Sequence, residues 1–265
     1  MVIFRHHMRR EASALIGWAI AVIALVVLQT SLFNVLQTPA LAAGMASVWH
    51  NLPPQFLQFV GGALNVFSVS GWIGTVDLSG WITLIVGIWV ALASVSVVAR
   101  DVDQGTLEFL LAMPVRRGRL LGERSLSLVL QLVLIYIGIF AAVVIAVALM
   151  GRSVSDLRVA ESLGVLLLDQ AALAGTLVLV SLFLRDQTYA VLTTVTVAAV
   201  FIFIPVFVDA NAPVAFLRRF TPFDYDAAGT LMLHGTYPAG HLVVAALWAA
   251  IAFLAAWAVF ARREL

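Results

Sequence analysis

Six long apolar runs constrain this chain more than any other feature. A helix that crosses a membrane needs about 20 mainly apolar residues. Runs of this length, without the alternation typical of strands, cover residues 12–36, 76–99, 120–150, 162–184, 188–208 and 241–261. Only 11% of the 265 residues are charged, whereas about a quarter are charged in a soluble domain. The sequence therefore predicts an all-α membrane protein, with one six-span domain over residues 1–265.

The arginines predict how this domain is oriented. With six spans, both termini lie on one side of the membrane, together with the segments around residues 100–124 and 185. That side holds eleven arginines and the opposite side holds four. Because basic residues are enriched on the cytoplasmic side, we expect both termini and the 100–124 segment in the cytoplasm.

The N-terminal segment precedes the first run and is basic. We expect residues 1–11 to form a short interfacial helix, with Arg5, Arg9 and Arg10 toward lipid headgroups and Phe4 and Met8 toward lipid. A cleaved signal peptide is the alternative. However, the apolar run that follows exceeds the ~7–15 residues of a signal peptide.

A charged segment, RDVDQGTLEFLLAMPVRRGRLLGER, separates the second and third runs over residues 100–124. Gly105 is expected to end the second span, and Thr106 to N-cap a short helix whose first turn holds Glu108. Pro114 ends it, and Leu107, Leu110 and Leu111 form one apolar stripe. Such a helix fits a groove on a partner protein, or it lies in the lipid interface; physics alone favours neither.

Two segments on the opposite side are expected to have structure. Residues 37–75 contain an amphipathic stretch after Pro53 and Pro54, typical of an interfacial helix. Residues 209–240, rich in proline and glycine, are expected to form a structured, partly re-entrant loop.

The fourth run contains Asp169 and Gln170. A carboxylate inside a membrane is costly unless it faces protein or water, so it is a candidate for a translocation path. The alternative is a structural carboxylate near the outer interface or one bonded by Thr193, Thr194 or Thr196 of the fifth run. Close to it, Ala171 and Gly175 form a small-residue stripe that indicates close helix packing.

The charged segment resembles the signature of ABC type-2 transporter permeases. The matching positions are Asp103, Gly105, Thr106, Leu107, Glu108, Leu110, Leu111, Pro114, Val115 and Arg117. The six-span pattern, the FTPF stretch before the last run and the terminal Arg-Arg-Glu-Leu also look like this family, and most like its NosY-like branch. Asp101 and Asp103 stand where glutamates are more common. Glu123 or Arg124 replaces a common lysine.

The resemblance implies a permease subunit, not an enzyme, of an ATP-driven exporter in the cell (inner) membrane of a bacterium or archaeon. The chain has no phosphate-binding loop, so ATP and Mg²⁺ would bind a cytoplasmic ABC ATPase subunit. This chain would bind no cofactor or metal itself. A second permease copy and membrane lipid are the other implied partners, and nucleic acid is not expected.

The resemblance also assigns residues 103–117 as the coupling helix that docks on the ATPase. The docking residues would be Asp103, Gly105, Thr106, Leu107, Glu108, Leu110, Leu111, Arg116 and Arg117, with Arg5, Arg9 and Arg10 nearby. Two alternatives stay open at this stage. One is a proton-coupled secondary carrier that uses Asp169, and the other is a membrane scaffold for metalloenzyme maturation.

Overall fold

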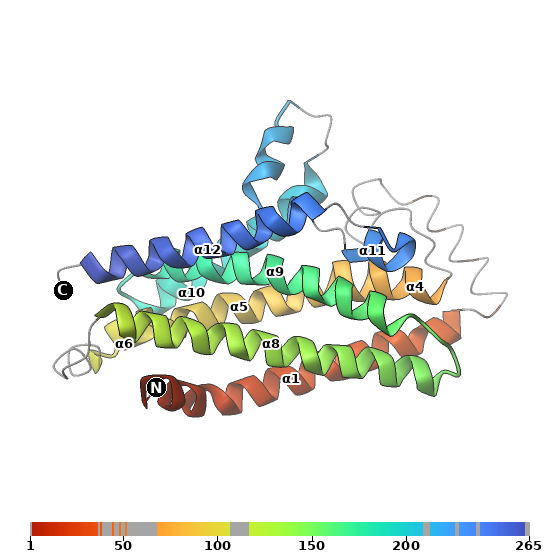
Figure 1. The fold of residues 1–265 in the computed structure, drawn as a ribbon, viewed down its shortest axis with the longest axis horizontal. Coiled ribbons are helices and arrows are strands. Elements are labelled where there is room, and N and C mark those ends of the chain that lie inside the picture. The colour runs from red at the N-terminus through yellow and green to blue at the C-terminus, as the bar shows by residue number, and fades with distance from the viewer. Residues whose placement is uncertain are drawn as a thin grey trace.

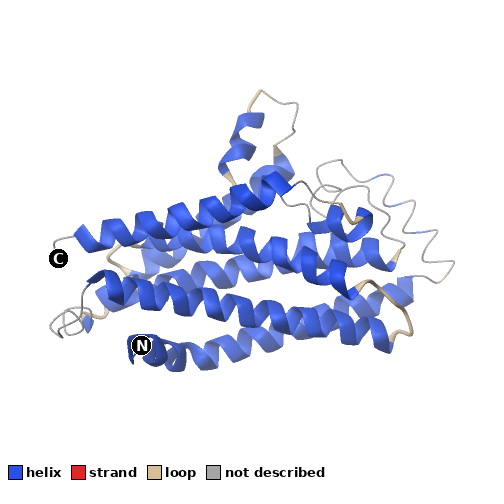
Figure 2. Ribbon diagram, viewed as in Figure 1, coloured by secondary structure: helices blue, strands red, loops and turns tan. Residues whose placement is uncertain are grey.

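The computed structural model describes residues 2–36, 68–106, 117–208, 213–225, 228–236 and 239–262, with residues 38, 44, 48 and 51 as isolated positions. Within these ranges the chain is helical and has no strand (Figure 2). Six helices are long and apolar enough to cross a membrane. Five of them lie in α1 (Val2–Leu36), α8 (Arg117–Leu149), α9 (Asp156–Ser181), α10 (Gln187–Phe207) and α12 (Ala239–Arg262). The second candidate span, Leu78–Val97, covers the end of η1 (Ile73–Ile82) and all of α5 (Thr83–Val97). The predicted all-α, six-span fold is confirmed.

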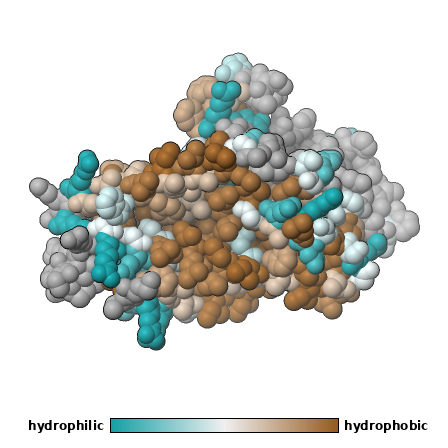
Figure 3. Space-filling view, viewed as in Figure 1, coloured by the Kyte–Doolittle hydropathy of each residue, from teal (hydrophilic) through white to brown (hydrophobic). Residues whose placement is uncertain are grey.

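The helices run side by side along the long axis, and both termini lie at the same end of the bundle (Figure 1). Helix α9 occupies the centre and packs against α5, α8, α10 and α12, while α1 packs mainly on α8. Apolar side chains gather in the middle of the face drawn in Figure 3, and hydrophilic ones lie toward the two ends. This surface matches a bilayer, in which apolar side chains face lipid and polar groups reach the interfaces.

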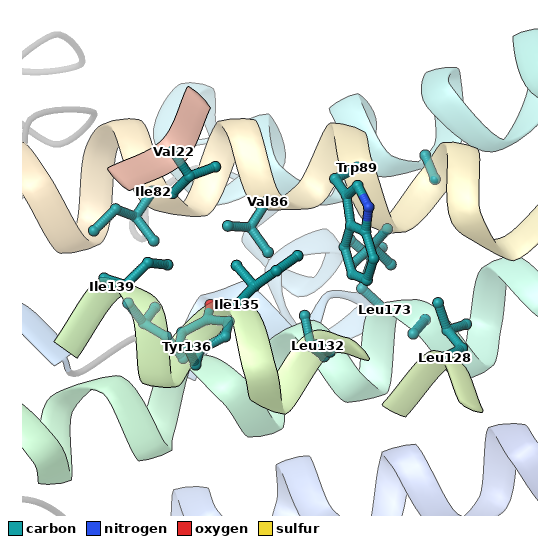
Figure 4. Close-up of a cluster of buried hydrophobic side chains, with 14 of the residues drawn as sticks. Val22, Ile82, Val86, Trp89, Leu128, Leu132, Ile135, Tyr136, Ile139 and Leu173 are labelled. Carbon is teal, nitrogen blue, oxygen red and sulfur yellow. The ribbon is translucent and has the colours of Figure 1, made fainter. Parts of the chain in front are cut away.

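The interior is built from aliphatic side chains that meet between the spans. Val86 of α5 points toward Ile135 of α8 (Figure 4), and both are buried. Where α9 meets α12, a Cβ on Gly175 would lie 3.0 Å from the Cβ of Ala252. The close packing predicted from the small-residue stripe is therefore present, because no larger residue fits there without a shift.

The second span differs from its prediction at its first turns. It begins with α4 (Val69–Trp72) and continues as a π-helix, η1 (Ile73–Ile82), before α5. Two hydroxyls bond carbonyls five residues back: Ser79 Oγ donates to Gly74 O at 3.0 Å, and Thr83 Oγ1 to Leu78 O at 2.9 Å. These bonds have the five-residue step of a π-helix. Long π-helices are rare, so a run of apolar residues predicts an ordinary α-helix instead.

Helix η1 is held against α11 (Ala228–His234) by a glycine pair. A Cβ on Gly74 would lie 3.1 Å from the carbonyl oxygen of Gly229, and one on Gly229 would lie 3.0 Å from that of Gly74. The two backbones can approach this closely only because neither residue has a side chain.

The structured loop expected over residues 209–240 contains η2 (Ala215–Phe220), η3 (Pro222–Tyr225) and α11 in its described part. A hydrogen bond ties it to α10 at a carbonyl that a proline leaves without its helical donor. Pro205 lacks an N–H, so the carbonyl of Phe201 loses its usual helical donor. The buried hydroxyl of Thr221 donates to that carbonyl at 2.7 Å. The amphipathic helix expected after Pro53 and Pro54 lies outside the described residues.

The N-terminal segment also differs from its prediction. Residues 2–36 form one continuous helix, so the short helix expected over residues 1–11 is the first part of α1 rather than a separate element. Met8, expected to face lipid, turns to α8 instead, where its sulfur lies 3.6 Å from Nε2 of Gln131. Polar groups on α8 hold this segment against the bundle, as described below.

Candidate functional site: polar contacts at the end that carries the termini

The strongest concentration of polar contacts surrounds Asp101. This residue lies in α6 (Ala99–Asp103), directly after the second span, and its side chain is fully buried. Its carboxylate accepts hydrogen bonds from Arg10 of α1 at 2.8 Å, from the Thr106 hydroxyl at 3.1 Å, and from Arg124 of α8. We call these four residues the Asp101 cluster. The cluster joins three helices that are distant in sequence, immediately before the 107–116 segment.

Arg124 gives this cluster a second attachment. Its guanidinium is 4% exposed and also donates to the carbonyl of Val97 at 2.7 Å. That carbonyl ends α5, because Val98 leaves the helical conformation (φ −142°, ψ −48°). The buried arginine therefore serves both as the counter-ion of Asp101 and as a donor at the end of a helix, where cations are favoured.

The electrostatics keep Asp101 charged. Burial alone would raise the pKa of its carboxyl. The hydrogen bond from Arg10 and the charge of Arg124 outweigh burial, so the pKa lies below its ordinary value. A buried carboxylate that retains its charge attracts both arginines, and this attraction holds the three helix ends together.

Asp103 adds a fourth helix. Its Oδ1 accepts a hydrogen bond from the backbone N–H of Gln187 at 3.2 Å. Gln187 is the first residue of α10, whose own N-cap, Asp186, accepts from the N–H groups of Thr188 and Tyr189. Two carboxylates at the start of a helix suit its positive end. Through Asp101 and Asp103, α6 is therefore tied to α1, α8 and α10.

Two further contacts attach α1 at this end. Glu123 of α8 accepts from the backbone N–H of Phe4 at 3.0 Å, and Arg119 donates to the same carboxylate at 2.8 Å. Arg100 donates to Glu11 at 3.0 Å. Glu123 thus satisfies one of the free donors in the first turn of α1.

The structure places the predicted docking residues in two groups. Gly105 adopts a positive φ of 65°, which favours glycine, and it follows α6. The second span, which Gly105 was expected to end, already ends at Val97, where Val98 leaves the helical conformation. Asp103, Gly105 and Thr106 adjoin the Asp101 cluster, and Arg117 begins α8. Leu107, Glu108, Leu110, Leu111 and Arg116 lie outside the described residues, as does the body of the predicted helix over residues 103–117.

The predicted N-terminal arginines separate in the structure. Arg5, Arg9 and Arg10 are all exposed, as headgroup contact requires, but they differ in their partners. Arg10 turns to Asp101, because a buried carboxylate offers a stronger partner than hydrated headgroups.

Asp169 and Gln170 are both buried in the bundle. Gln170 Nε2 donates to the carbonyl of Thr83 at 2.9 Å and so links α9 to α5. The hydroxyl of Thr194, one expected partner of Asp169, donates to the carbonyl of Ala190 in its own helix. Gln170 therefore has a structural contact, and the assignment of this pair to a translocation path stays a prediction.

Sequence reasoning did not identify Asp101 and Arg124 as partners. It treated both only as departures from a family pattern. One signal was present: an arginine within the third apolar run requires a buried partner, and Asp101 closely follows residue 99, where the preceding run ends. His7 is also buried near this end, and no pattern in the sequence indicated it.

The comparisons with known proteins identify the family of the chain. The family model described as ABC-2 family transporter protein matches residues 1–265. A search of curated proteins finds no match. With six candidate spans and a match over its full length, the chain belongs to the ABC-2 transporter family and is a multi-pass membrane permease subunit of an ABC transporter.

Proposed function

We propose that this permease works in an ATP-driven exporter. A cytoplasmic ATPase subunit binds ATP and Mg²⁺, and its closure moves the permease so that substrate leaves the cell. Residues 103–117 form the coupling helix, and Leu107, Glu108, Leu110 and Leu111 contact the ATPase. Within the family, we place the chain in the NosY-like branch, on the signature residues of the 100–124 segment.

The observation that carries this proposal is the attachment of α6. The segment that enters the coupling helix is tied to α1 and α8 through Asp101 and to α10 through Asp103. A displacement of the coupling helix would therefore move α1, α8 and α10 as well as the second span. An exposed loop without such contacts would absorb the displacement instead.

The proposed orientation places this end of the bundle in the cytoplasm. Eleven of the fifteen arginines belong to segments at this end, which favours the cytoplasmic side. The proposed assembly holds two permease copies and two ATPase subunits in the inner membrane of a bacterium or archaeon. Exposed apolar side chains on α1 and α10, such as Ile16, Ile20 and Leu192, supply surface for the second copy as well as for lipid.

Single cysteines test both orientation and docking, because the chain has no cysteine of its own. We expect Glu108→Cys to react with a membrane-impermeant maleimide only from the cytoplasmic side. We also expect it to form a cross-link to the co-expressed ATPase subunit. Arg152→Cys, on the connection between α8 and α9, is the matched control and should react only from the opposite side.

Cross-linking of the ATPase at position 152 rather than position 108 would contradict the proposal. So would labelling of both positions from the same side. Transport by this chain alone, driven by a pH gradient without ATP, would instead support a proton-coupled carrier that uses Asp169.

A further inference from the structure

A groove opens beside α1 at the end of the bundle that carries the termini. It has a volume of about 240 Å³ and lies between α1, α5 and the first residue of α10. We call it the Trp18 groove. Its walls include Glu11 and Trp18 of α1, Trp89 and Leu92 of α5, Arg100 of α6 and Gln187 of α10.

The end of the groove near Arg100 is polar, and the formal charges of the residues that line it cancel. Arg10, which does not line the groove, lies 3.9 Å from Glu11 and pairs with Asp101. Arg100 Nη1 donates to Glu11 Oε1 at 3.0 Å, and Gln131 and Gln187 contribute neutral amides. The side chains of Arg100 and Glu11 are 35% and 14% exposed, so a ligand can reach both. This end therefore offers one cation and one anion side by side, which matches a ligand that carries both charges.

The rest of the wall is apolar or aromatic. It contains Ala14, Leu15, Trp18, Trp89, Leu92 and Ala93. Leu92 is 36% exposed on the surface of the bundle, among side chains that face lipid. Tryptophan is favoured where acyl chains meet headgroups, so the polar end and the aromatic walls follow the polarity of a lipid molecule.

The volume limits what can enter. Pockets that enclose a drug-sized ligand have about 300–1,000 Å³, so a groove of about 240 Å³ cannot enclose a two-chain lipid. It has room for a headgroup and the first carbons of a chain. The remainder of the chains would stay in the bilayer along α1 and α5.

We propose that the Trp18 groove binds the headgroup of a zwitterionic aminophospholipid of the phosphatidylethanolamine class. The primary ammonium donates to the Glu11 carboxylate, and the phosphate accepts from the Arg100 guanidinium. The direct ion pair between these side chains is replaced by two charge-assisted contacts with the lipid. An anionic headgroup competes with Glu11 for Arg100 and brings no ammonium to Glu11, whose other arginine neighbour, Arg10, lies 3.9 Å away and pairs with Asp101. A trimethylated ammonium has no N–H to donate.

Native mass spectrometry of the purified full chain in detergent tests this site without an ATPase, so its outcome is independent of the exporter proposal. The probes are dioleoyl phosphatidylethanolamine, phosphatidylcholine and phosphatidylglycerol, each added at equal concentration. We expect wild type to retain the ethanolamine lipid about tenfold more tightly than the glycerol lipid, the ratio that 1.4 kcal/mol produces.

Two variants separate the charges. Glu11→Gln leaves Arg100 without its partner, so the preference should reverse toward the anionic glycerol lipid. Arg100→Gln removes the phosphate contact, so retention of all three lipids should fall. Arg119→Gln is the matched control, because Arg119 pairs with Glu123 away from the groove, and it should bind lipid as wild type does.

The reversal in Glu11→Gln is a gain of binding, which an unfolded chain would not produce. Equal retention of the three lipids by wild type would overturn the proposal. An unchanged ethanolamine preference in Glu11→Gln would also overturn it. Retention of phosphatidylcholine as tight as that of phosphatidylethanolamine would rule out the contact between the primary ammonium and Glu11.

Discussion

Arg124 joins the third span to the end of the second through two acceptors, the carboxylate of Asp101 and the carbonyl of Val97. Both charged side chains are buried. A buried ion pair of this kind adds little net stability, because the cost of desolvation offsets much of the attraction. Its main effect is to fix where the two helices meet. Loss of one partner is strongly destabilising, since it leaves the other charge buried and uncompensated.

Replacement of one partner of this pair should therefore be severe. We expect Asp101→Asn to lower the free energy of unfolding by about 3–5 kcal/mol, because the Arg124 charge stays buried without its counter-ion. Unfolding of the purified chain in detergent micelles measures this loss. Arg119→Gln breaks a pair whose arginine side chain is 64% exposed and should cost at most about 1 kcal/mol. Equal losses in the two variants would contradict the assigned role of burial.

The pH dependence of Asp101 has a defined sign. Its pKa is depressed in the folded chain, and the unfolded value is about 3.9. Its contribution is complete above the unfolded pKa and disappears as the pH falls through the folded pKa. The difference in Tm between wild type and Asp101→Asn should thus be constant from about pH 7 to pH 5 and should shrink below about pH 4. A difference that shrinks already between pH 7 and pH 5 would show that the pKa is raised.

Thr221 and Pro205 should be energetically coupled, although they do not bond each other. Thr221→Val removes the donor to the Phe201 carbonyl and should cost about 1–3 kcal/mol of unfolding free energy. Pro205→Ala restores a helical N–H for the same carbonyl. In that background the Thr221→Val cost should be smaller by about 1 kcal/mol. Additive losses in the double-mutant cycle would show that Thr221 acts in some other way.

The glycine contact between η1 and α11 should not tolerate a methyl group. In Gly229→Ala the new Cβ would meet the Gly74 carbonyl at 3.0 Å, and such overpacking costs about 1–3 kcal/mol. Gly164→Ala is the matched control within a helix, because nothing lies within 4 Å of a Cβ there. The unfolding free energy of Gly164→Ala should equal that of wild type or exceed it by up to about 1 kcal/mol. The unfolding free energies of Gly229→Ala and Gly164→Ala, each compared with wild type, test the close contact between Gly74 and Gly229. If neither variant changed the unfolding free energy, the contact would be refuted.

The sequence predicts the spans well because the lipid environment leaves few alternatives. A chain that crosses a bilayer must satisfy its backbone hydrogen bonds internally. An apolar run of sufficient length is therefore a helix, and the third, expected over residues 120–150, is Arg117–Leu149. The π-helix was not predicted, because long π-helices are rare. Its contact with Gly229 of α11 joins segments that are distant in sequence, which no local pattern reveals.

The candidate site could be predicted only in outline. Gly105 follows α6 with a positive φ, a conformation that favours glycine, so the end of this helix can be predicted from the sequence. The partners of Asp101 come from positions 10 and 124, so their meeting depends on how α1 packs against α8. The same packing turns Met8 toward Gln131 and brings the exposed Arg10 to Asp101, against an expectation based on the N-terminal segment alone.

In the proposed mechanism, the segment over residues 103–117 passes the motion of an ATPase into the spans. The ATPase activity of the partner subunit, co-purified with wild type or with Glu108→Arg in the same lipid, tests this role. We expect wild type to stimulate ATP hydrolysis, whereas Glu108→Arg should insert normally and give no stimulation. Stimulation by Glu108→Arg equal to that of wild type would contradict it.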